Sequence, residues 1–584
     1  MSFSLRLQPS STLVSRLFSV GLLAACLTLN VACDGEGVGE DAGEPAVTPE
    51  PDDGGAVDDD GGAVDDDAGR PDDAGTENDD AGTENDDAGS ENGDAGNADA
   101  GDAGDDAGAA GDDAGEVDGG SDMDAGVVDA GPSADGGSDV DAGAGDVDAG
   151  APPPVVTEGY GVDPARCGQA PYSWLDSSAV GSVLEDEDVV SMSAFFINIV
   201  LGQLENQGAI SLDRTPSRDV NVRRIRYQTQ DRGHLIDATG LVGIPTVDST
   251  EELPVLLFLH GTTGLSDVCA PSRDPLGDTI YETQLVGLLA SLGYIVVAPD
   301  YIGMKSMGDP SPELHPYLMG EPTAIASLDM VRAVQQLVAV VQPDLVPGPV
   351  VVNGASQGGH AAAFTTRFLP HYAPELDVRG AVWGIPPTNL AGHVDIALRS
   401  LSNPTANTVG WALAANDWYA SDPNGLSSIF VSPYDVDLPQ QARAECGLSS
   451  LEGNVNTLED LFVQELLDAA QNPGIDGYAP WDCMAREGSL PTTTVPRDDD
   501  IPALFVIGAN DTLVDPQVER ESFTTLCAQG YELEFLECAG AGHSDGYLYS
   551  LDDQFDFLEA RLAGAPMPAS TCSLQMATTC SSTP

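Results

Sequence analysis

The stretch VVVNGASQGGHAAAFTTRFL, residues 350–369, predicts a short buried strand, a tight turn and a helix in immediate succession. The turn contains the pattern Gly-x-Ser-x-Gly, with glycines at 354 and 358 and Ser356 between them. Glycine on both sides lets the backbone and the following helix approach closely, so that the serine hydroxyl projects beyond the end of the strand. Ser356 is therefore our candidate nucleophile.

Segments on both sides of this turn alternate between strand and helix patterns. Val220–Gln228 and Leu235–Ile244 alternate in the manner of a hairpin, whereas the later strands are uninterrupted apolar runs. These runs are Leu253–Leu259, Tyr294–Ala298, Val350–Val352, Val378–Trp383 and Ala503–Ile507, and helical patterns cover Val189–Leu204, Tyr281–Leu292, Thr323–Val341 and Val518–Gln529. The alternation predicts an α/β fold with a mostly parallel sheet flanked by helices, spanning 151–584.

The charge of the chain is concentrated before this region. The 584 residues carry a formal charge of −75, and residues 34–150 hold 40 Asp or Glu against one basic residue, Arg70. The acidic balance excludes a nucleic-acid binder, which needs a basic surface to displace phosphate counterions. Asp-Ala-Gly recurs 14 times between Asp41 and Gly150 without apolar positions that could stack. We expect 26–150 to be a disordered, self-repelling linker.

The amino terminus resembles an export signal. Arg6 and Arg16 precede the apolar stretch 17–33, which is too short to span a membrane comfortably. Leu-Ala-Ala before Cys26 is similar to the cleavage site of bacterial lipoproteins, and Cys33 is the alternative lipidation site. We expect a signal peptide over 1–25 and a membrane anchor at the lipidated cysteine.

A second Gly-x-Ser-x-Gly pattern surrounds Ser544. Chain order distinguishes the two, because a serine nucleophile in this kind of turn needs an acid and then a histidine downstream. No histidine follows His543, so Ser544 lacks these partners. For Ser356, we assign the base to His543 and the acid to Asp511, which follows the strand 503–507. Asp515 is the alternative acid, and we expect it to cap the next helix.

Charge that develops on a substrate oxygen requires hydrogen-bond donors. One donor should be the backbone N–H of Gln357, immediately after the nucleophile. The other should come from the turn after the strand 253–259, where we assign Thr262 and keep Gly261 as the alternative.

Taken together, these motifs resemble the α/β-hydrolases of the secretory lipase and esterase type. The similar pieces are HGTTGLSDVCAPSR from residue 260, VVAPDYIGM from 296, HPYL from 315, SLDMVRAV from 327, NGASQGGHAA from 353 and GANDTLVDP from 508. The resemblance implies an α/β-hydrolase fold and ester hydrolysis by Ser356, Asp511 and His543 without a metal or cofactor. It also implies a cap inserted after the strand that follows the Ser356 helix, about 386–500.

The cap is the largest insertion able to cover Ser356, so we expect it to set the acyl length of the substrate, with short to medium acyl groups preferred. It contains Trp411, Trp418, Tyr419, Phe430 and Tyr434 and a helical pattern over Leu458–Ala470. Most of these aromatic side chains should pack within the cap itself.

Eight cysteines in 151–584 are consistent with oxidation outside the cytoplasm. Spacing favours the pairs Cys446–Cys483, Cys527–Cys538 and Cys572–Cys580, which leaves Cys167–Cys269. No pair has the spacing of a structural zinc site.

The sequence thus favours an exported serine hydrolase, held at the cell envelope or extracellular and monomeric, which takes small-molecule or lipid esters. A serine peptidase on the same fold and an inactive surface binding module are the alternatives.

Overall fold

The computed structural model describes residues 156–158, 167–168 and 173–584, except 421, 423, 473, 499 and 500. The predicted signal peptide, both candidate lipidation cysteines and the acidic linker lie outside the described residues.

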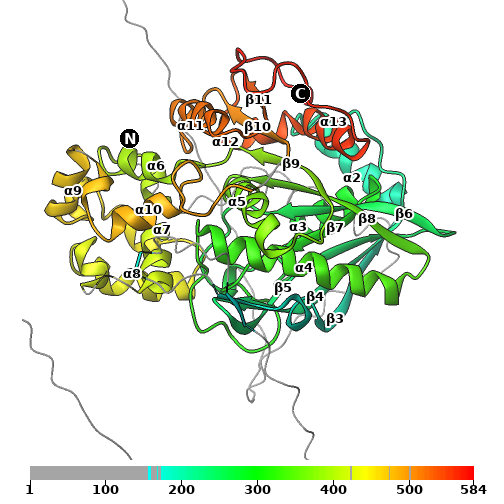
Figure 1. Cartoon of the computed structure of the whole chain (residues 1–584), viewed down its shortest axis with the longest axis horizontal. Helices are drawn as coiled ribbons and strands as arrows, with labels where there is room; N and C mark the ends of the chain where they lie inside the picture. The colour runs from blue at the N-terminus through cyan, green and yellow to red at the C-terminus, as the bar shows by residue number, and fades with distance from the viewer. Residues whose placement is uncertain are drawn as a thin grey trace, which may run out of the picture. The chain divides into compact units, whose positions relative to one another are not determined.

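A nine-stranded sheet forms the centre of the described chain (Figure 1). Its spatial order is β11 (Leu533–Cys538), β10 (Ala503–Gly508), β9 (Val378–Gly384), β8 (Leu345–Ala355), β6 (Glu251–Leu259), β7 (Ile295–Pro299), β5 (His234–Pro245), β4 (Val220–Asp231) and β3 (Val183–Met192). The six strands from β11 to β7 pair in parallel, and β5, β4 and β3 continue the sheet antiparallel. A separate antiparallel pair joins β1 (Val156–Glu158) to β2 (Ser173–Leu175).

Helices cover both faces of the sheet, as the apolar strands require. One core contains α4 (Gly320–Val341), α5 (Gln357–Tyr372) and α11 (Pro516–Ala528). The opposite core contains α2 (Ala194–Asn206), α3 (Ile280–Ser291) and α13 (Leu551–Leu562). Alternate residues of β6 point to the two faces: Leu257 belongs to the first core and Leu256 to the second. Although α4 is long and apolar enough to cross a membrane, most of it is buried in the first core.

Five helices between β9 and β10 form a third core, separate from the sheet. They are α6 (Leu390–Ala397), α7 (Pro404–Tyr419), α8 (Tyr434–Ala444), α9 (Gln464–Gln471) and α10 (Trp481–Glu487), which Figure 1 shows grouped on one side of the sheet. Trp411 and Trp481 meet edge to face at 6.0 Å, and both are fully buried. We call residues 386–498 the cap.

The predicted fold class is confirmed, with two local differences. The predicted helix over 189–204 begins only at Ala194, because Val189 and Val190 lie in β3 paired with β4. Ser193 caps the helix instead, accepting a hydrogen bond from the Phe196 N–H. In the cap, the helical pattern over 458–470 contains a short 3-10 turn at Leu458–Asp460, and α9 begins only at Gln464.

Four disulfides are present among the described cysteines, and all four predicted pairings were wrong. The observed bonds are Cys167–Cys483, Cys269–Cys446, Cys527–Cys572 and Cys538–Cys580. Cys446 lies beside Cys269 because the cap folds back over the loop after β6, and Cys483 in α10 reaches Cys167 near the start of the described chain. Cys527, in the last turn of α11, bonds to Cys572, whereas Cys538 at the end of β11 bonds to Cys580, so the two cysteines contact different parts of the carboxyl-terminal tail. Sequence distance does not predict such contacts, which depend on the tertiary fold.

Candidate active site

Ser356 lies in a strained turn between β8 and α5. Its backbone has φ 58° and ψ −118°, a left-handed conformation that a residue with a side chain adopts only when the surrounding structure enforces it. The Ser356 N–H donates to the carbonyl of Gly384 at 2.8 Å. A Cβ atom at Gly358 would collide with the carbonyl of Leu259, and one at Gly354 would collide with the carbonyl of Gly358. The two glycines therefore make this turn possible.

Three side chains from different elements meet at this turn. The Oγ of Ser356 lies 2.9 Å from Nε2 of His543, the first residue of the short helix α12 (His543–Leu548). Nδ1 of the same imidazole lies 2.7 Å from Oδ2 of Asp511, in the turn after β10. A ring that donates from Nδ1 to the carboxylate leaves Nε2 free to accept the serine proton.

The two aspartates of this turn have different partners. Oδ1 of Asp511 accepts hydrogen bonds from the backbone N–H groups of Leu513 and Val514, which fixes its carboxylate toward His543. Asp515 accepts from the N–H groups of Gln517 and Val518 and caps α11, as the sequence predicted.

The loop after β6 carries Gly261 and Thr262 beside Ser356. Both border the same cavity as the serine, and Thr262 is buried, with its hydroxyl 2.8 Å from the hydroxyl of Tyr317. Tyr317 also accepts a hydrogen bond from the Asn407 amide of the cap at 2.7 Å. The loop after β6 is thus connected to the cap through Tyr317.

A buried aromatic stack supports this loop, and our sequence reasoning did not assign its members. Tyr301 stacks on His260 at 4.3 Å and on His315 at 5.5 Å, and its hydroxyl donates to the His260 carbonyl. His315 donates from Nδ1 to the carbonyl of Ile302 and accepts at Nε2 from the Gln357 side chain at 2.6 Å. Burial lowers the pKa of His315 to about 3, so the ring stays neutral and can act as this acceptor. The motif HPYL, residues 315–318, was the sequence feature that could have indicated a role for His315.

Two cavities border Ser356. The larger, of about 220 Å³, extends between β6, α3, α12 and α13, and we call it the α3 pocket. The smaller, of about 40 Å³, lies under the cap against α6 and α7, and we call it the cap pocket. None of the five cap aromatic residues singled out in the sequence lines either of these cavities.

One buried acid, Glu282 on α3, lines the α3 pocket. Desolvation, opposed by a hydrogen bond with Tyr281 and assisted by the nearby Asp300 carboxylate, raises the pKa of Glu282 to about 7. No Arg or Lys among the described residues forms an ion pair with Glu282. Sequence periodicity gave no sign of it, because it lies in the first turn of a mostly apolar helix.

Ser544 follows His543 in α12 and lines the same pocket. No side chain among the described residues stands in the relation to Ser544 that His543 has to Ser356. It therefore serves as a matched control for Ser356.

Known structures share this architecture. The cell-wall-degrading esterase LipA of Xanthomonas oryzae superposes with a TM-score of 0.54 at 20% identity, over 66% of this chain and 98% of the esterase. Candida antarctica lipase A superposes with a TM-score of 0.51 at 17% identity, over 68% of this chain and 85% of the lipase. This chain has the α/β-hydrolase fold.

Sequence comparison finds a match to one protein family over part of the chain. Residues 277–415 match the secretory lipase family, which confirms the resemblance inferred from the motifs. Lipase 5 of Candida albicans is 26% identical over an alignment of 276 positions that covers 45% of this chain. The match spans about half (53%) of the length of that lipase.

Proposed function

We propose that the protein hydrolyses carboxylic esters through an acyl-enzyme intermediate on Ser356. The observation that carries the proposal is the hydrogen-bonded chain Ser356–His543–Asp511 at the mouth of an apolar cavity. The resemblance to secretory lipases supports the ester as the substrate class.

In this mechanism, Oγ of Ser356 attacks the ester carbonyl carbon while Nε2 of His543 takes the hydroxyl proton. Asp511 stabilises the imidazolium that forms. The negative oxygen of the tetrahedral intermediate accepts hydrogen bonds from the backbone N–H groups of Gln357 and Thr262. The alcohol then leaves with the proton from His543. A water molecule, deprotonated by the same imidazole, attacks the acyl group and releases the carboxylic acid.

The test combines covalent labelling with turnover. We expect a fluorophosphonate probe to label the wild type and Ser544→Ala but not Ser356→Ala. Turnover of nitrophenyl esters should fall by several powers of ten in Ser356→Ala and stay near wild type in Ser544→Ala. If the probe labels the protein but only peptides are hydrolysed, the protein is a peptidase. If the protein is not labelled and hydrolyses no substrate, the binding module is the remaining function.

We further propose that the protein is exported and held by a lipid on Cys26, with Cys33 as the alternative site. The apolar stretch 17–33 and the four disulfides support an oxidising compartment. The acidic linker would then act as a spacer between the anchor and a monomeric hydrolase domain. Mass spectrometry of the amino terminus tests this proposal, and an unmodified terminus beyond Cys33 contradicts it.

A further inference from the structure

The two cavities at Ser356 differ in size and in chemistry. Leucines of α3 together with Phe258, Leu551 and Phe555 make up much of the wall of the α3 pocket. The cap pocket is smaller, and its wall combines apolar side chains such as Leu390 and Leu513 with the polar side chains of Tyr317, His393, Asn407 and Thr408. An ester has one half that is often a long hydrocarbon chain and one half that is often polar, so the two cavities match the two halves of such a substrate.

The α3 pocket continues beyond the immediate site. A second apolar cavity of about 80 Å³ lies beneath α2 and shares six wall residues with it, among them Leu285, Leu288 and Leu548. On the α2 side it is lined by Phe196, Ile197, Val200, Leu201 and Leu204. A largely apolar wall, interrupted by Glu282, therefore runs from Ser356 along α3 to the underside of α2, on the side of the sheet that carries α2, α3 and α13.

We propose that the acyl chain of the substrate lies in the α3 pocket, along Leu285 and Leu288, and that the cap contacts the alcohol half. This inference rests on the ester hydrolysis proposed above and names the substrate as an ester of a medium or long unbranched acid. It places the control of acyl length in α3 and α2, in contrast to the cap that the sequence suggested.

The physical basis is the transfer of methylene groups out of water. Each methylene that enters an apolar wall contributes favourably, so kcat/KM should rise roughly tenfold for each added pair of carbons until the path is full. The cap pocket offers little apolar surface for such a gain. Its hydroxyl and amide groups suit an alcohol that carries its own polar atoms.

Leu285 is the residue to change, because its side chain is only partly buried and borders both apolar cavities. We expect Leu285→Trp to fill the path and lower kcat/KM for nitrophenyl laurate by roughly a hundredfold, the effect of two lost carbon pairs, while nitrophenyl acetate changes less than about twofold. Leu288→Trp is the second variant, should Leu285→Trp fail to fold. Thermal unfolding and the fluorophosphonate labelling rate report whether each variant is folded with a working nucleophile.

Thr408→Trp in the cap pocket is the matched control. We expect it to leave the laurate to acetate ratio unchanged and to alter the preference between methyl and bulky alcohol esters of the same acid. The inference is overturned if Thr408→Trp abolishes the preference for laurate while both leucine variants retain it. A wild type without preference for acyl length also overturns it.

Failure of the proposed function would be recognisable separately. In that case no ester is hydrolysed, and the pocket is tested by binding of a fluorescent fatty acid to the full chain. Binding to the wild type that is lost in Leu285→Trp would support the pocket without the hydrolysis. Absence of binding would overturn the pocket as well.

Discussion

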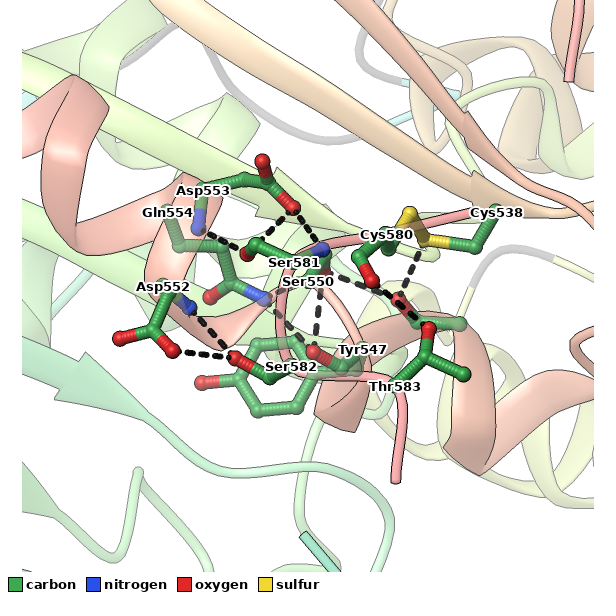
Figure 2. The surroundings of a disulfide bond; sticks show 11 residues. Cys538, Tyr547, Ser550, Asp552, Asp553, Gln554, Cys580, Ser581, Ser582 and Thr583 are labelled. Atoms are coloured by element: carbon green, nitrogen blue, oxygen red, sulfur yellow. Dashed lines mark hydrogen bonds between the residues drawn. A yellow bond between two sulfur atoms is a disulfide. The ribbon is translucent and has the colours of Figure 1, made fainter. Parts of the chain in front are cut away.

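Ser582, two residues before the carboxyl end of the chain, is hydrogen-bonded to Asp552 in the first turn of α13. Its hydroxyl accepts from the Asp552 N–H and donates to the Asp552 carboxylate, both at 2.9 Å (Figure 2). Ser581 makes the same pair of contacts with Asp553. Asp552 also binds Arg214 in the segment after α2. The tail thus caps a helix that walls the α3 pocket, and Cys580 fixes it to β11.

Removal of the Cys538–Cys580 disulfide should destabilise the protein. The Cys538–Cys580 bond closes a loop over a sequence separation of 42 residues. A crosslink that closes a loop of that length limits the conformations of the unfolded chain and so raises the free energy of unfolding by about 4 kcal/mol. We expect the double variant Cys538→Ser and Cys580→Ser to lose free energy of unfolding on that scale in urea titrations. Leu574→Ala, an exposed position of the same tail, is the control and should change little. Equal stability of the two variants would refute the structural role.

Asp511 and Asp515 should have different functions although they lie only four residues apart. Asp511→Asn keeps the size of the side chain but favours the wrong tautomer of His543, so kcat should fall by about 10⁴. Asp515→Ala removes only the cap of α11, which costs about 1 kcal/mol of stability and leaves kcat near wild type. Steady-state kinetics and thermal unfolding of both variants provide the check, and the opposite pattern would assign the acid to Asp515.

Glu282 should make stability depend on pH. Its pKa is about 7 in the folded protein, against 4.5 for the free side chain. Between pH 4.5 and pH 7, the folded state therefore keeps a proton that the unfolded state has released. The associated stability is therefore present below about pH 4.5 and is lost as pH rises through 7. Glu282→Gln should stabilise the protein by a few kcal/mol at pH 8 and by little at pH 4. The exposed Glu521→Gln is the control, and identical pH profiles for the two variants would contradict the burial of the charge.

Tyr317 should position the oxyanion loop through the Thr262 hydroxyl. Tyr317→Phe removes the oxygen shared by Thr262 and Asn407. One buried hydrogen bond is worth about 1 kcal/mol, so kcat should fall roughly fivefold to tenfold, with a smaller change in KM. Tyr434→Phe on α8 keeps Tyr317 intact and should match the wild type. An effect on KM alone would place Tyr317 in substrate binding instead.

Local chemistry explains why much of the site could be predicted from sequence. The turn at Ser356 needs glycine at fixed offsets, and Asp515 needs only its own helix to act as a cap. Chain order then selected His543 and Asp511, which the structure brings within hydrogen-bond distance of one another. These features depend on few residues close together in sequence.

Features that depend on distant segments were missed. The wrong start at Val189 arose because β3 is defined by its pairing with β4, which periodicity does not show. Glu282 lies in an apolar helix whose inner face becomes a cavity only after α12 and α13 pack against it. Likewise, the role of His315 as an acceptor for Gln357 follows from the return of its loop to the start of α5, which sequence patterns do not show.

The pattern of the disulfides has a consequence for how the chain is oxidised. Loop closure favours near neighbours, so an unfolded chain would first join Cys572 to Cys580 and Cys527 to Cys538. Both bonds are absent from the native set, in which these four cysteines pair across separations of 42 and 45 residues. Correct oxidation must therefore wait until β11 and α11 have placed the tail, or errors must be exchanged afterwards by free thiolates. A disulfide isomerase should consequently raise the yield of native protein from the reduced chain more than an oxidant alone.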